Sequence, residues 1–112
     1  MIYAAIAFFA VAAIFGLINL KNLLAKTEIP KAVVYSHGLF AAIGLVILIV
    51  YAIQSPAHYP MVSIILFGTA ALGGFYMFFR DLSKKGISLG IAVIHGLLAV
   101  AGFVMLLLFA FA

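Results

Sequence analysis

The chain has 112 residues, of which 70% are hydrophobic and only 7% are charged. Soluble domains carry about 25% charged residues, and a chain this short has too little interior to hide so many apolar side chains from water. The formal charge of +4 does not indicate nucleic-acid binding, because the basic residues lie between apolar segments and do not alternate with exposed aromatic side chains. The lack of cysteine excludes disulfides, thiolate metal sites and a cysteine nucleophile. The composition therefore predicts an integral membrane protein of one domain.

Four apolar segments are long enough to cross a bilayer as helices, which takes about 20 residues each. In chain order they are Ile2–Leu20, Ala32–Ile53, Met61–Phe79 and Ile87–Phe111. No alternating pattern of a membrane barrel is visible, so helices are expected. The connections are short, which predicts that successive helices pack as antiparallel neighbours. The expected fold is an all-α bundle of four transmembrane helices.

The basic residues all belong to the first and third connections between these segments. They are Lys21, Lys26, Lys31, Arg80, Lys84 and Lys85. The middle connection has none, so the positive-inside rule places connections 21–31 and 80–86 in the cytoplasm and both termini outside. We expect the cytoplasmic (inner) membrane of a bacterium as the location.

The two halves of the chain, residues 1–54 and 59–112, align without a gap when the sequence is shifted by 58 positions. The clearest match is the tripeptide His-Gly-Leu, which begins at His37 in the first half and at His95 in the second. Each half has two spans, so the halves run in the same direction and form a parallel repeat. The sequence thus predicts two tandem helical hairpins that hold both histidines at one depth, where their imidazoles can converge.

Ionisable side chains inside a membrane are costly and usually functional. The simplest alternative is a neutral imidazole bonded to a backbone carbonyl or to a hydroxyl of Tyr35, Ser36 or Tyr76. A protein zinc site needs three or four ligands, and no cysteine or buried carboxylate accompanies the two histidines. A proton relay would need further acids or histidines across the bilayer. Haem needs only two axial ligands, which favours His37 and His95 as the ligands of one iron.

Small residues follow each histidine at i+4 and i+7, on the same face of the helix. These residues are Ala41, Gly44, Ala99 and Gly102. A porphyrin standing parallel to the helices needs small side chains there, whereas the alternative is close contact between the second and fourth spans. Two further pairs, Ala12 with Gly16 and Ala70 with Gly74, are typical of helix–helix packing. Three basic residues could pair with the haem propionates, namely Lys31, Arg80 and Lys84.

With these histidines and small-residue faces, the chain resembles in architecture the four-helix membrane cytochromes of the b type. The resemblance implies one haem b per chain and a role as an electron-transfer protein or an oxidoreductase subunit. Its expected partners are the lipid bilayer, a quinone or quinol or another redox protein, and a second copy in a homodimer. Two alternatives stay open: a small transporter or channel with the histidines lining a polar pathway, and a cofactor-free membrane anchor or assembly subunit.

Overall fold

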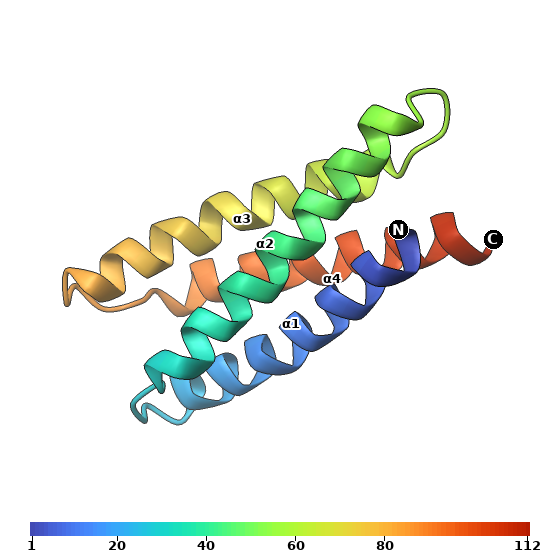
Figure 1. Ribbon diagram of the computed structural model, residues 1–112. Coiled ribbons are helices and arrows are strands. Elements are labelled where there is room, and N and C mark those ends of the chain that lie inside the picture. Colours follow the sequence, from blue (N-terminus) through green and yellow to red (C-terminus); the bar gives the residue numbers. More distant parts are fainter.

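The computed structural model describes all 112 residues and contains four α-helices and no strand (Figure 1). The helices are α1 (Ile2–Leu24), α2 (Lys31–Gln54), α3 (Met61–Leu82) and α4 (Leu89–Phe111). The prediction of an all-α, four-helix fold is confirmed.

Each helix is long and apolar enough to cross a membrane. At 1.5 Å per residue, the shortest helix measures about 33 Å, close to the thickness of a bilayer core. The bundle measures 44 × 21 × 20 Å, and many large apolar side chains point away from it. Leu17, Ile53 and Leu72, for example, are 67%, 73% and 71% exposed. A surface of this kind suits lipid rather than water, so the chain is a membrane protein.

The helix ends differ from the predicted spans where charged residues begin. Helices α1 and α3 continue for about one turn past the apolar segments, through Lys21 and Arg80. Two lysines that follow these ends, Lys26 and Lys84, adopt φ angles of 56° and 55°, the left-handed conformation that often terminates a helix. Helix α4 begins two residues later than predicted, because the Ser88 hydroxyl accepts a hydrogen bond from the backbone N–H of Ile91 and caps the helix.

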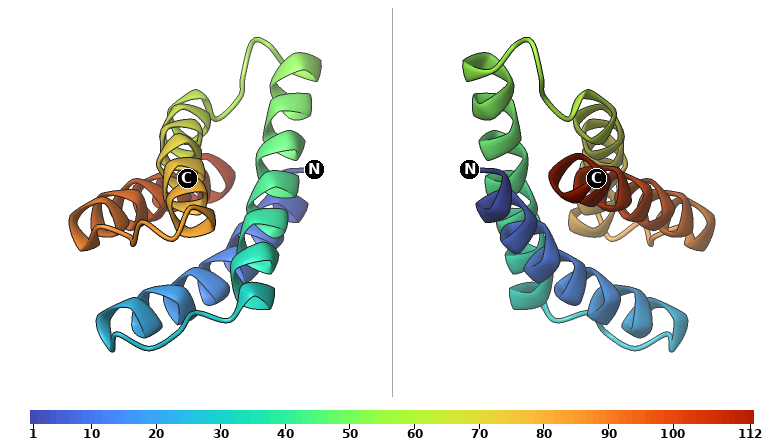
Figure 2. Two further views of the ribbon diagram at one scale, coloured as in Figure 1. Left: turned by 90° about the vertical axis from the view of Figure 1, so that its left-hand side faces the viewer. Right: turned by 90° about the vertical axis from the view of Figure 1, so that its right-hand side faces the viewer.

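The helices form two antiparallel hairpins, α1 with α2 and α3 with α4 (Figures 1 and 2). Around the bundle, α1 packs against α2 and α4, and α3 packs against α4 and α2. The α1–α2 and α3–α4 connections lie at one end, which we call the basic end because all six Lys and Arg residues lie in or next to them. The opposite end, which we call the terminal end, holds both termini and the α2–α3 connection (Figure 1).

The backbones of diagonally placed helices do not approach within 8 Å, and long side chains meet across the centre instead. The rings of Phe9 in α1 and Phe67 in α3 stack with centroids 3.8 Å apart and planes 4° from parallel. Leu48 and Leu106 complete the core and are fully buried. The centre of the bundle is thus closed by apolar side chains between its middle and the terminal end.

One polar side chain, Ser63, lies in this core, and its hydroxyl is buried without a hydrogen-bond partner. Ala5, which lies 58 residues earlier in the chain, is also fully buried. An unpaired buried hydroxyl is destabilising, so Ser63→Ala should raise the free energy of unfolding by about 1 kcal/mol. Thermal unfolding in detergent micelles measures this change. The reverse exchange, Ala5→Ser, should be destabilising, and a less stable Ser63→Ala variant would contradict the assignment of an unpaired hydroxyl.

Candidate functional site

The structure brings His37 and His95 together across the bundle, one turn to two turns inside the basic end. Their helices, α2 and α4, lie on a diagonal, and the two imidazole centroids are 6.0 Å apart with ring planes at 74°. Both side chains are half-buried. The convergence of the two imidazoles that the sequence predicts is therefore present. It joins the two hairpins, because His37 belongs to the first and His95 to the second.

Each imidazole is held by a backbone carbonyl of the other helix of its own hairpin. The Nδ1 atom of His37 lies 2.7 Å from the carbonyl oxygen of Ala12, and Nδ1 of His95 lies 2.7 Å from that of Ala70. A carbonyl can only accept a hydrogen bond, so in each neutral imidazole Nδ1 carries the proton and donates it. The lone pair then resides on Nε2, which has no protein hydrogen-bond partner in either histidine. The bonds to the Tyr35, Ser36 and Tyr76 hydroxyls that the sequence allowed do not form.

A glycine makes room for each ring. A Cβ atom built on Gly16 would lie 3.0 Å from Cε1 of His37, and one built on Gly74 would lie 3.2 Å from Cε1 of His95. Both distances are shorter than ordinary van der Waals contact. Ala12 and Gly16 therefore do more than bring two helices together: Ala12 supplies the carbonyl, and Gly16 supplies the space that seats the imidazole.

The small residues that follow the histidines divide into two levels. Ala41 and Ala99, one turn from the histidines, are half-buried. Gly44 and Gly102, one turn further, are buried beneath the rings of Phe9 and Phe67. The alternative that these residues bring α2 and α4 into close contact is wrong, because the two backbones stay apart. The phenyl rings thus bound the site on its terminal side.

The three basic residues expected near the site differ in whether their side chains already bind other groups of the protein. Lys31 begins α2 and is exposed, and Lys84 is exposed in the α3–α4 connection. Arg80 is engaged by the protein: its Nε donates to the carbonyl of Gly86 at 3.0 Å and its Nη2 to that of Lys85 at 2.9 Å. The guanidinium also lies 6.0 Å from the centre of the Tyr76 ring. Arg80 therefore fixes the α3–α4 connection, and Lys31 and Lys84 are the two of the three whose side chains make no hydrogen bond within the chain.

Protein ligands beyond the two histidines are lacking. No group of three or more His, Cys, Asp or Glu side chains gathers in the structure. The stacked Phe9 and Phe67 rings also interrupt the centre of the bundle, and the only polar side chain buried beyond them is Ser63. The centre of the bundle on the terminal side of the histidines is thus filled mainly by apolar side chains.

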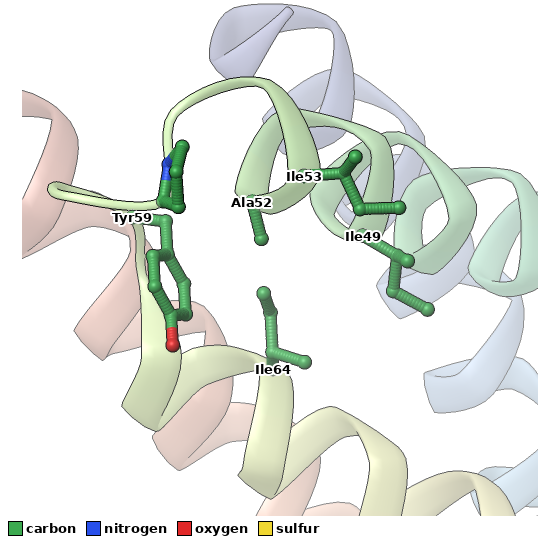
Figure 3. Close-up of a pocket in the computed structure, with 6 residues that line it drawn as sticks. Ile49, Ala52, Ile53, Tyr59 and Ile64 are labelled. Carbon is green, nitrogen blue, oxygen red and sulfur yellow. The ribbon is translucent and has the colours of Figure 1, made fainter.

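A separate, shallow and open pocket of about 330 Å³ lies at the terminal end, between the last turns of α2 and the start of α3. Figure 3 shows Ile49, Ala52 and Ile53 of α2 on one side of it and Tyr59 and Ile64 on the other. Its lining is almost entirely apolar, and it lies at the opposite end of the bundle from the histidines. It is not part of the histidine site.

From the sequence, a backbone carbonyl is one alternative partner for each imidazole, and the structure bears this out with the carbonyls of Ala12 and Ala70, which the sequence did not single out. The carbonyls of Ala12 and Ala70 cannot be identified from the amino-acid sequence, because every residue has a backbone carbonyl. A signal for Gly16 and Gly74 was present, since each lies four residues after the alanine whose carbonyl is used. Comparison of the chain with protein families, with curated proteins and with solved structures gives no match.

Proposed function

We propose that the chain binds one haem b between His37 and His95 and carries electrons in the membrane. The observation that supports this proposal best is the state of the two Nε2 atoms. Each imidazole has its Nδ1 proton donated to a carbonyl, which leaves the Nε2 lone pair free. Histidines that bind metals commonly donate their second nitrogen in this way, because the bond fixes the tautomer and orients the ring.

The separation of the rings also suits two ligands on opposite sides of one metal ion. Bonds from a metal to an imidazole nitrogen are about 2 Å long, as in zinc sites, so the centroids of two opposed imidazoles lie about 6 Å apart. The two rings here are separated by 6.0 Å. Haem is the group that needs only two protein ligands of this kind, and iron ligated by both would exchange single electrons with a donor and an acceptor.

The remaining parts of the proposal follow from the charges and the position of the site. Under the positive-inside rule the basic end faces the cytoplasm and both termini face outward. The propionates would point to the basic end, where Lys31 and Lys84 are exposed and free to pair with them. The electron partner would be a quinol in the bilayer or a redox protein that meets the basic end. Both axial ligands belong to one chain, so a homodimer is not needed to complete the site.

Carbon monoxide tests whether the site carries electrons or binds a gas. Iron with two imidazole ligands has no open position, so the spectrum of the reduced, haem-loaded protein should not change on addition of carbon monoxide. The same sample should cycle reversibly between reduced and oxidised forms. A carbon monoxide complex formed at once and in full would contradict two-histidine ligation and would indicate a five-coordinate site.

The structure also suits one other function, that of a cofactor-free structural subunit. The two imidazole–carbonyl bonds already tie α1 to α2 and α3 to α4. In that case the histidines would stabilise the hairpins and the purified protein would bind no haem. The two functions differ in whether the Nε2 atoms ligate haem iron. An absorption spectrum of the purified protein distinguishes them, because only the haem-binding function gives a haem spectrum.

A further inference from the structure

Helix α1 presents one polar side chain, Asn19, on the face that lines the bundle interior. This interior face consists of Ala5, Phe9, Ala12, Gly16 and Asn19, which follow one another at spacings of four and three residues. The first three are buried, and the last two are half-buried. Asn19 therefore continues the face that supplies the core phenylalanine and the seat of His37.

The Asn19 amide lacks a partner. Its Oδ1 atom is buried and makes no hydrogen bond, and Ser63 Oγ is the one other side-chain atom of the chain in that state. Ser63 lies at the terminal end, among the apolar side chains of the core and away from the two histidines. A buried amide end without a partner is costly, and such a group in a native protein calls for an explanation such as a ligand.

Asn19 is placed beside the histidine site, on its basic side. It follows Gly16, whose position touches the His37 ring, by three residues, a rise of about 4.5 Å along the helix. The matching position of the second hairpin, 58 residues later, is Met77, which has no hydrogen-bond donor. The amide is thus a polar group that only one hairpin contributes.

We propose that Asn19 hydrogen-bonds a propionate carboxylate of the haem that His37 and His95 would hold, an inference that rests on the proposed function. A half-turn of the amide exchanges its oxygen and nitrogen, so the buried end can present an N–H donor to an anionic oxygen. Lys31 and Lys84 are exposed to solvent, whereas Asn19 reaches the carboxylate from inside the bundle. Asn19 is a binding residue in this role and takes no part in ligating iron.

The role predicts opposite effects on the empty and the loaded protein. Asn19→Leu removes an unpaired amide from the haem-free protein, so its thermal unfolding midpoint in detergent should rise. The same variant loses a hydrogen bond to a charged group, so its dissociation constant for haem should rise about tenfold. Met77→Leu, the matched change in the other hairpin, should alter neither quantity. An Asn19 that only packs the helices would give a lower midpoint when replaced and an unchanged affinity.

Haem dimethyl ester makes the test specific to the carboxylate. Esterified propionates carry no charge, so the difference in affinity between the original protein and Asn19→Leu should shrink to less than about threefold with this ligand. If the original protein binds haem and Asn19→Leu binds it equally well, the role of Asn19 is wrong and the proposed function stands. If the original protein binds no haem, both are wrong.

Discussion

Replacing either His37 or His95 with alanine should abolish the six-coordinate haem spectrum. Each imidazole would supply one of the two axial ligands, and the other histidine of the chain, His58, is exposed at the terminal end and stacks on Phe109. No third histidine, cysteine or carboxylate lies beside the pair to replace a lost ligand. Each single substitution should therefore convert the iron to a five-coordinate form or release it, with a fall in haem affinity of at least about 100-fold.

His58→Ala is the matched control for this experiment, since it removes an imidazole without touching the pair. It should leave the spectrum and the haem content unchanged. Circular dichroism of each variant checks that the helices persist, because His37→Ala and His95→Ala each also lose one hydrogen bond to a carbonyl. A spectrum that survives one of the two substitutions in a folded protein would be inconsistent with ligation by both histidines.

Gly44→Ala should produce the largest loss of stability among the glycine variants. The added Cβ would lie 3.0 Å from two ring carbons of Phe9 and 3.1 Å from a third. Phe9 is buried and stacks on Phe67 at 3.8 Å, so its ring cannot retreat without breaking that stack. Overpacking of this kind costs about 1–3 kcal/mol, and the free energy of unfolding should fall by that amount.

Gly38→Ala provides the control on the same helix. A Cβ at Gly38 meets no atom within 4 Å, so the substitution should be neutral or slightly stabilising through the better helix propensity of alanine. Thermal or denaturant unfolding in one detergent compares the two variants directly. Equal stabilities would mean that the Phe9 ring is free to move and that the stack at the centre of the bundle is loose.

The fold was largely predictable because lipid imposes a simple rule. Each segment long and apolar enough to cross the bilayer forms a helix, and the four predicted spans match the four helices. The ends were less predictable, since apolar character stops at Leu20 and Phe79 whereas helical backbone does not. Lysine, arginine and leucine all favour helices, so α1 and α3 extend beyond the apolar segments.

The site was predictable only in part, for a different reason. A shift of 58 residues identified His37 and His95 as equivalent, and the structure brings them together. The duplication itself stays a prediction from the sequence. What the sequence could not supply is which side chain covers a small residue: Gly44 and Gly102 were expected to face the porphyrin, and the structure places Phe9 and Phe67 over them. Such neighbours depend on the rotation of each helix about its axis, which the apolar sequence of a membrane span specifies weakly.

The most direct test of the central proposal is an absorption spectrum of the purified protein after expression with ample haem. We expect a Soret band with sharp α and β bands on reduction, and one haem per chain by quantitative extraction. A protein that folds as four helices and stays colourless would contradict haem binding, and the two histidines would then serve to tie the helices of each hairpin together.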